Sequence, residues 1–277
     1  MVMYPEKYWW EQDFEHLSVT RREQGDRHTA VITLDLPQQR NAMSEEMTSS
    51  WARLADLLRD DTQLACVVVT GAGSAFTSGG NLGWLMAEPD ASVSDLRARM
   101  RNFYCRWLSM TRLEVPVVAA VNGHAIGAGL ALALACDVRY VAEQARLAVP
   151  FTGLGLHPGM ATTWSLPAVA GPALAADMLL TGRVVMGHEA VGLGLASAAA
   201  PADEVLRLAL DAADRVAAAA PVATRLTLAA LRGGGHANPG AALEWEALAQ
   251  ATTMATADLQ EGVRAATERR APAFTGR

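Results

Sequence analysis

Apolar and polar positions follow two different patterns along the first sixty residues. Residues 19–22 and 30–34 have the β-branched, half-apolar composition of strands and are separated by a polar turn at 25–27. From residue 44 to about residue 58 the apolar positions recur with helical spacing. Ser44 supplies a capping hydroxyl, and the two acids after it suit the positive end of a helix. The sequence therefore predicts two strands followed by an amphipathic helix.

Short continuous apolar runs mark the interior of the fold. Residues 66–70 and 117–121 are typical of strands that are covered on both faces. Helical patterns span residues 96–108 and, starting at a glycine, residues 129–136. This alternation of strands and helices predicts an α/β fold with stacked ββα units.

The composition changes after Pro201. From there the chain is rich in alanine and helical in pattern, with a break at the three glycines 233–235. We therefore expect an α/β core over residues 1–200, which would hold the functional site, and a distinct helical region over residues 201–277.

Length, charge and apolar content limit the possible functions. The chain has 277 residues, 51% of them hydrophobic, which is enough for one large core with a helical appendage. A net charge of −6 without a run of Lys or Arg argues against nucleic-acid binding. The N-terminus lacks the charged head and apolar segment of a signal peptide, and polar residues interrupt the apolar run 115–136. We expect a cytoplasmic protein without a membrane span.

The polar residues give no sign of a metal or a permanently bound cofactor. The six histidines are scattered without Cys or acid partners at ligand spacing, and the three cysteines lie far apart in apolar surroundings, which indicates reduced, buried thiols. Gly71-Ala72-Gly73 lacks the third glycine of a dinucleotide fingerprint, because position 76 is Phe. The sequence also has no Gly-x-Ser-x-Gly nucleophile elbow. A nicotinamide-dependent enzyme is therefore disfavoured.

Four short segments occur in order along nearly the whole chain. They are Asn41-Ala42-Met43, residues 75–82 (AFTSGGNL), residues 122–129 (NGHAIGAG), and the closing pair 261–264 (EGVR) and 274–277 (FTGR). With these segments the chain resembles the crotonase (enoyl-CoA hydratase/isomerase) superfamily. The resemblance implies a spiral of ββα repeats with a C-terminal helical trimerisation region, assembled as a homotrimer or a dimer of trimers. It also implies an acyl-CoA substrate, with coenzyme A as part of that substrate.

The resemblance further implies an oxyanion hole formed by the backbone N–H groups of Gly80 and Ala128. A thioester enolate places negative charge on its oxygen, and two fixed donors in a dry site stabilise it by roughly 3 kcal/mol each. The helix expected from Gly129 adds its positive end at the same place. Two ordinary glycine-rich turns in a packed core are the alternative interpretation.

Carboxylates are missing from three positions at which relatives carry them. Hydratases of the superfamily use two glutamates to align water and move a proton, and the matching residues here are Ala131 and Phe151. Some relatives that isomerise double bonds or attack an aromatic ring place an aspartate at the position of Gly159. None of these three side chains accepts a proton. The sequence therefore argues against ordinary hydration.

Three functions remain open at this point. One is isomerisation through His157, whose imidazole can transfer protons near neutral pH, although a loop histidine bonded to backbone explains this residue equally well. The second is decarboxylation, because loss of carbon dioxide forms the enolate without a protein base. The third is an acyl-CoA-binding protein that has no catalytic activity.

Further residues are expected to contact the acyl-CoA substrate. Apolar and aromatic side chains would line the acyl pocket, and arginines would meet the CoA phosphates. The residues that the resemblance assigns to substrate and CoA binding are Arg40, Ala42, Ser78, Asn81, Leu82, Trp84, Phe151, Trp164 and Arg270. Plain core packing and surface solvation are the competing explanations for these side chains.

Overall fold

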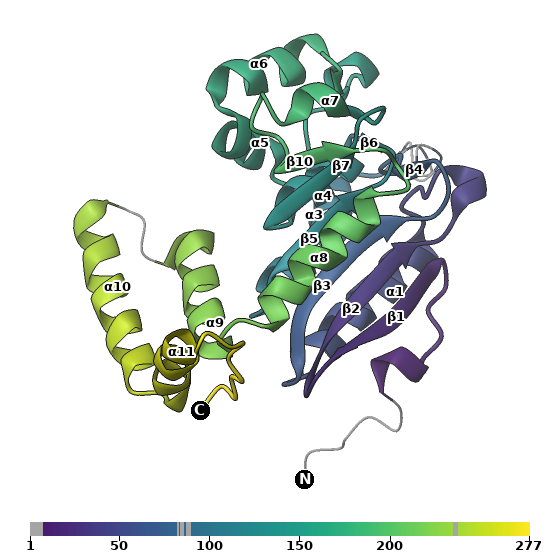
Figure 1. Cartoon of the computed structure of the whole chain (residues 1–277). Coiled ribbons are helices and arrows are strands. Elements are labelled where there is room, and N and C mark those ends of the chain that lie inside the picture. Colours follow the sequence, from purple (N-terminus) through teal and green to yellow (C-terminus); the bar gives the residue numbers. More distant parts are fainter. Residues whose placement is uncertain (1–7, 82, 84–85, 87–89, 235–237) are drawn as a thin grey trace.

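The computed structural model describes residues 8–81, 83, 86, 90–234 and 238–277. Its larger sheet has six strands in the order β1-β2-β3-β5-β7-β10 (Figure 1). The strands are β1 (Leu17–Gln24), β2 (Arg27–Leu34), β3 (Leu64–Gly71), β5 (Val117–Val121), β7 (Val138–Ala142) and β10 (Ala198–Ala200). β1 and β2 pair antiparallel, and the other neighbours pair parallel. β3 and β5 are buried along their whole length, as their continuous apolar sequences predict.

A smaller sheet receives the chain after each of three strands of the larger sheet. Its order is β4-β6-β8-β9, with an antiparallel last pair. The strands are β4 (Ala75–Thr77), β6 (His124–Ile126), β8 (Arg146–Ala148) and β9 (Val185–Met186). Since β3 leads to β4, β5 to β6 and β7 to β8, the chain repeatedly crosses between the sheets and then forms a helix. This arrangement confirms the predicted α/β fold of ββα repeats.

Helices follow these strand pairs and cover the sheets. The core helices are α1 (Glu45–Arg59), α3 (Val93–Trp107), α4 (Ala128–Ala135), α5 (Thr162–Ala170), α6 (Pro172–Thr181), α7 (Gly187–Ala190) and α8 (Val205–Ala217). Short 3-10 segments are η1 (Trp9–Glu11), η2 (Pro37–Gln39), η3 (Leu108–Arg112) and η4 (Thr152–Leu154). The predicted cap of α1 is confirmed, because Ser44 Oγ accepts the N–H of Met47 at 3.1 Å. No helix in the described part of the chain is long and apolar enough to cross a bilayer.

Two tryptophans join α1 to α3. Trp51 and Trp107 are fully buried, and their rings stack with centroids 5.0 Å apart. Trp51 Nε1 donates to the Trp107 carbonyl at 3.1 Å, so this polar atom is satisfied inside the core. The tryptophan pair thereby fixes the C-terminal half of α3 against the core.

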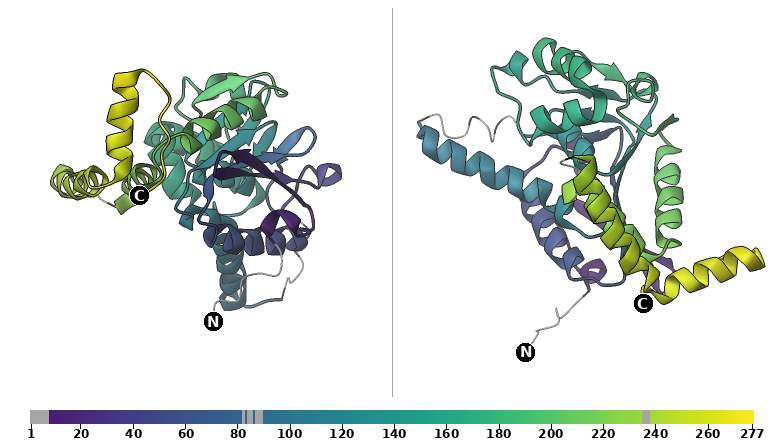
Figure 2. Two further views of the ribbon diagram at one scale, coloured as in Figure 1. Left: turned by 60° about the horizontal axis from the view of Figure 1, so that its bottom comes forward. Right: turned by 90° about the vertical axis from the view of Figure 1, so that its left-hand side faces the viewer.

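Helix α8 packs against β3, β5 and β7 on the opposite face of the larger sheet (Figures 1 and 2).

The last helices of the chain extend away from the two sheets (Figures 1 and 2). They are α9 (Pro221–Ala229), α10 (Pro239–Met254) and α11 (Ala257–Glu268), with a π-helical segment η5 (Ala230–Gly234) after α9. Arg232 joins this region to the core, because its guanidinium pairs with Asp137 at 2.6 Å. Of the helical region expected over residues 201–277, α8 packs on the larger sheet, whereas α9 to α11 project from the core.

The expectation that all three cysteines are buried is wrong for one of them. Cys66 and Cys136 are buried, and burial raises the pKa of each thiol to about 12. Cys105 is exposed on α3. This helix buries Phe103 and Trp107, four residues apart on one face, so position 105 lies on the other face.

Candidate active site

Two glycine-rich turns meet beside the smaller sheet. One follows β4 at residues 78–80, and the other joins β6 to α4. Gly79 has a φ of +86°, and a side chain there would collide with the carbonyl oxygen of Ile126. A Cβ on Gly129 would lie 2.5 Å from the carbonyl oxygen of Thr77. Glycine is required at both positions because the two backbones are in direct contact.

The Asn41 side chain holds the chain segment that leads into the first turn. It is fully buried, and its amide nitrogen donates to the carbonyls of Ala72 at 2.9 Å and Ala75 at 2.8 Å. Two residues later, the N–H of Met43 donates to the carbonyl of Gly79 at 2.9 Å. Buried hydrogen bonds of this kind fix the path of the backbone on both sides of β4.

A cavity of about 310 Å³ lies between the two turns, α3 and the segment that follows β8. Its walls are mostly apolar. The lining residues are Ser78, Gly80, Met100, Phe103, Tyr104, Ile126, Gly127, Ala128, Pro150, Phe151, Leu154, Leu156, His157, Gly159 and Met160. An apolar cavity with a few polar groups is typical of a small-molecule site.

Gly80 and Ala128 line this cavity, and their backbone amides have no partner among the residues that the structure describes. Within the described residues, neither N–H donates to a carbonyl or to a side chain. Ala128 is the first residue of α4, so its N–H has no acceptor inside the helix and lies at the positive end of the helix dipole. A negatively charged oxygen would be stabilised at this end of the cavity.

Tyr104 and His157 are the titratable side chains among the residues that line the cavity. His157 Nδ1 lies 2.8 Å from the carbonyl oxygen of Pro158. Since a carbonyl only accepts, Nδ1 carries a hydrogen, and in the neutral imidazole this leaves Nε2 as an acceptor. Burial raises the pKa of the Tyr104 phenol, which therefore stays protonated at neutral pH. No carboxylate is among these lining residues, which include Phe151 and Gly159.

Comparison with known proteins identifies the family. The family model for enoyl-CoA hydratase/isomerase matches residues 25–277. The chain belongs to this family. It is 32% identical over 252 residues to a Mycobacterium bovis protein named probable enoyl-CoA hydratase, covering 91% of this chain and 96% of that protein. It is 34% identical to the 2,3-dehydroadipyl-CoA hydratase of Escherichia coli, covering 89% of this chain and 95% of that protein.

A solved structure supports the same assignment for the fold. The enoyl-CoA hydratase of Bacillus anthracis superposes with a TM-score of 0.86 at 29% identity, over 95% of this chain and 100% of that chain. The resemblance to the crotonase superfamily and the crotonase-like fold are therefore confirmed. The chain is a member of a family of enzymes that act on CoA thioesters.

Several residues predicted from the family resemblance come together in the structure. Gly80 and Ala128, from different turns, line the same cavity as Ser78, Phe151 and His157. These residues come from three separate segments of the sequence. Their proximity follows from the stacking of consecutive ββα repeats.

Other predicted residues of this family member lie next to the cavity without lining it. Arg40 is exposed, and its carbonyl accepts the N–H of Ser78 at 2.9 Å. Ala42 is buried, and Asn81 is half-buried directly after the turn at residues 78–80. The predicted residues Leu82 and Trp84 lie outside the described residues.

Trp164 and Arg270 lie apart from the cavity of their own chain. Trp164 is 75% exposed, because α5 buries residues 162, 165 and 166 and thus places residue 164 on its outer side. Arg270 follows α11 and pairs with Glu261 and Glu268, each at 2.6 Å. The hydrogen bond from Arg270 and the N–H of Ala273 lower the pKa of Glu261 to about 2. Neither side chain is among the residues that line the cavity of this chain, so their contacts with substrate stay predictions.

The contribution of α3 to the site was not predicted from the sequence. Met100, Phe103 and Tyr104 line the cavity from this helix. A signal exists in retrospect, because these positions and Trp107 share one helix face by their spacing of three or four residues. Such a face is equally typical of plain core, so the spacing alone does not indicate a ligand site.

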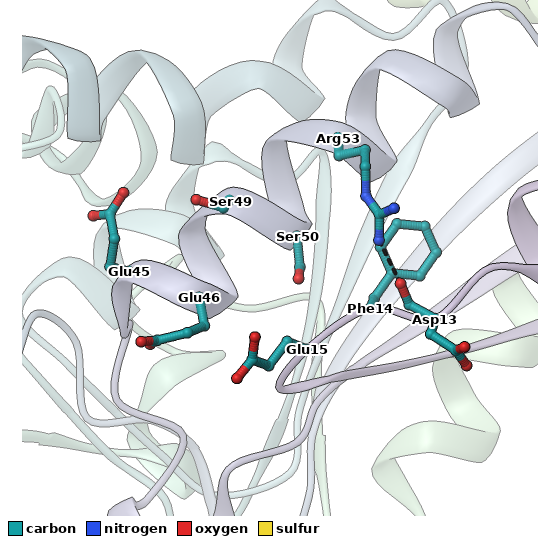
Figure 3. Close-up of a pocket in the computed structure, with 8 residues that line it drawn as sticks. All are labelled: Asp13, Phe14, Glu15, Glu45, Glu46, Ser49, Ser50 and Arg53. Atoms are coloured by element: carbon teal, nitrogen blue, oxygen red, sulfur yellow. Dashed lines mark hydrogen bonds between the residues drawn. The ribbon is translucent and has the colours of Figure 1, made fainter.

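A second pocket lies between α1 and the segment before β1 (Figure 3). Its lining residues are Asp13, Phe14, Glu15, Glu45, Glu46, Ser49, Ser50 and Arg53. The Arg53 guanidinium lies 4.5 Å from the centroid of the Phe14 ring and donates to the Asp13 carbonyl. The acidic lining would repel the phosphates of an acyl-CoA.

In the described part of the chain, no three or more His, Cys, Asp or Glu side chains come together in a way that suits a metal ion.

Proposed function

We propose that the protein is an acyl-CoA enzyme that stabilises a thioester enolate with the backbone N–H groups of Gly80 and Ala128. The observation that supports this proposal is that both amides line one apolar cavity and lack a partner among the described residues. The charge of an enolate rests on its oxygen, and fixed donors in a dry site stabilise it without reorganisation. The N-terminus of α4 adds a favourable potential at the same oxygen.

Two-glutamate hydration is not the reaction that we propose. Ala131 is buried inside α4, and Phe151 and Gly159 line the cavity where a proton-accepting group would be needed. Hydration requires groups that orient water and move its proton, and apolar side chains do neither. The enolate would form instead by proton transfer or by loss of carbon dioxide. For proton transfer, His157 is the candidate base, because the neutral imidazole, with Nδ1 bonded to the Pro158 carbonyl, has Nε2 as an acceptor.

Arg40 is the better candidate for contact with the CoA phosphates. It is exposed beside the turn that carries Ser78, and none of its side-chain atoms is paired within the described residues. Arg270 is held by Glu261 and Glu268, and binding a phosphate would require breaking those ion pairs. We therefore assign the phosphate contact to Arg40, with Ala42 and Asn81 as neighbours of the bound CoA.

We also propose that the protein assembles as a homotrimer or a dimer of trimers through its C-terminal helices. α10 buries no residue against its own chain, and Leu243, Leu248 and Met254 are exposed on it. Apolar side chains on a projecting helix favour contact with another copy. Light scattering should give a mass three or six times that of the 29.3 kDa chain.

A substrate panel tests the proposed activity. The purified protein is incubated with enoyl-, dienoyl-, malonyl- and methylmalonyl-CoA, and binding and turnover are measured separately. We expect turnover of at least one of these thioesters. Binding without turnover of any of them would contradict the proposal and favour an acyl-CoA-binding protein.

The role of His157 is tested within the same assay. In His157→Ala, loss of turnover with binding intact would support proton transfer by the imidazole, and unchanged turnover would remove His157 from the mechanism. His124→Ala is the matched control. His124 is exposed, does not line the cavity, and accepts the N–H of Arg146 at 3.1 Å.

A further inference from the structure

The phenol of Tyr104 occupies space in the cavity that a side chain at position 159 would need. A Cβ built on Gly159 would overlap the Tyr104 hydroxyl oxygen and would lie 2.8 Å from its Cζ. The backbone of Gly159 has no positive φ, so its conformation does not require glycine. The absence of a side chain at Gly159 therefore leaves room for the hydroxyl group of Tyr104.

The Tyr104 hydroxyl is a polar group without a partner in the described part of the chain. Within the described residues it makes no hydrogen bond. Its ring is half-buried and meets Phe103 edge to face, with centroids 6.2 Å apart. Burial raises the pKa of the phenol, so its hydroxyl keeps its proton at neutral pH.

The cavity thus combines a protonated phenol with two amides that lack a partner among the described residues. Tyr104 comes from α3, whereas Gly80 and Ala128 come from the two glycine-rich turns. Two amides that hold an oxyanion leave the adjacent α-carbon as the nucleophilic atom of the enolate, and a phenol in the same cavity can supply a proton to that carbon.

We propose that Tyr104 is a catalytic residue that protonates the α-carbon of an enolate formed from a 2-carboxyacyl-CoA. This inference rests on the proposed function. First, the bond between the α-carbon and the carboxylate breaks, carbon dioxide leaves, and the electron pair enters the enolate. The enolate carbon then forms a C–H bond with the phenol hydrogen while the Tyr104 O–H bond breaks. The negative charge moves from the thioester oxygen to the phenolate, which recovers a proton from water.

The lining of the cavity favours this substrate class. Among the residues that line it, Tyr104 is an acid and His157 is an imidazole, but there is no carboxylate. Loss of carbon dioxide needs no base. In addition, a substrate carboxylate held against apolar side chains such as Met100 and Phe151 loses hydration, which raises the free energy of the bound substrate. The carbon dioxide that leaves is neutral and does not have this cost. The net reaction consumes one proton and releases one carbon dioxide.

Stereochemistry in heavy water tests the role of Tyr104. Methylmalonyl-CoA is the probe, and the variants are Tyr104→Phe and the control Tyr140→Phe, whose ring is half-buried on β7 outside the cavity. The wild-type protein and the control should place one deuterium on one face of the product. Tyr104→Phe should lower kcat by about 100-fold or more and give deuterium on both faces, because water then protonates the carbon. Unchanged kcat and unchanged stereochemistry in Tyr104→Phe would overturn the proposal.

A nitronate analogue of the enolate separates this inference from the proposed function. The wild-type protein should bind a CoA nitronate at least ~100-fold more tightly than the matching saturated CoA thioether. Equal binding would overturn the proposed function and with it the role of Tyr104. A clear preference for the nitronate without decarboxylation of malonyl- or methylmalonyl-CoA would overturn only the inference. Thermal unfolding of Tyr104→Phe confirms that the variant is folded.

Discussion

A Cβ on Gly79 would lie 3.1 Å from the amide nitrogen of Ala128. The first glycine-rich turn is therefore in contact with the start of α4. Through this contact the amides of residues 80 and 128, which are far apart in sequence, line one cavity. The backbone of the candidate site depends on the absence of a side chain at position 79.

Gly79→Ala should lower the free energy of unfolding by about 2 kcal/mol or more. The new Cβ would collide with the carbonyl of Ile126 and would also force alanine to a φ of +86°. Gly80→Ala is the matched control, because a Cβ there meets nothing within 4 Å. Urea unfolding of both variants measures the difference. Equal stability of Gly79→Ala and the wild-type protein would contradict the described contact.

Arg232→Ala should uncouple the projecting helices from the core. The guanidinium donates to Asp137 and to the carbonyls of Leu113 and Thr111. Its loss removes the cation from Asp137, which keeps a hydrogen bond from the N–H of Val117, and removes a donor from the two carbonyls, which costs about 3 kcal/mol. Limited proteolysis should then cut faster between α8 and α9.

The control for this variant is Arg207→Ala. Arg207 pairs with Glu204 and Asp211 on the exposed side of α8, and such surface pairs contribute ~0.5 kcal/mol or less. Equal cleavage rates of the two variants would show that Arg232 does not dock the C-terminal region.

Asp61 should make stability depend on pH in the acid range. Burial raises the pKa of its carboxyl, but hydrogen bonds from His28 and Trp9, each 2.7 Å long, outweigh burial, so the pKa lies below the usual 3.8. A lowered pKa in the folded state stabilises the protein above pH 3.8, and this contribution is lost as the pH falls through the folded value. Asp61→Asn should therefore cost about 1.5 kcal/mol at pH 7 and progressively less below pH 4.

Urea unfolding between pH 7 and pH 3 measures this dependence. Asp60→Asn is the control, because the Asp60 side chain is 85% exposed. A difference between Asp61→Asn and the wild-type protein that stays constant over this range would contradict the account.

Much of the fold is predictable because its signals are local. A strand buried on both faces leaves no polar position, so the apolar run 117–121 predicts β5 with its observed ends. The start of α1 is a local signal too, because the Ser44 hydroxyl accepts the N–H of Met47, three residues later in the chain. In the site, close backbone approach restricts the residue choice to glycine, so the glycine-rich segments indicate where Gly80 and Ala128 lie.

The remaining site residues depend on packing between distant segments. Tyr104 lies in the cavity because α3 packs over Gly159, and the sequence of a helix does not specify which neighbour its aromatic face meets. Trp164 does not line the cavity of its own chain, because α5 places this residue on its exposed side, and the sequence does not specify which side of the helix faces the cavity. Arg270 was assigned to CoA without its partners Glu261 and Glu268, which lie nearby in sequence but become close only through the turn after α11.

Turnover of Ala128→Pro measures how much the N–H of residue 128 contributes to catalysis. Proline at the first position of α4 removes the N–H of residue 128 at a place where helices tolerate proline, and Ala128→Gly retains the N–H as the matched control. We expect a loss of kcat of about 100-fold or more for Ala128→Pro, and roughly wild-type kcat for Ala128→Gly, on the thioester that the wild-type protein converts. A folded Ala128→Pro variant with wild-type kcat would contradict the claim that this amide stabilises the enolate.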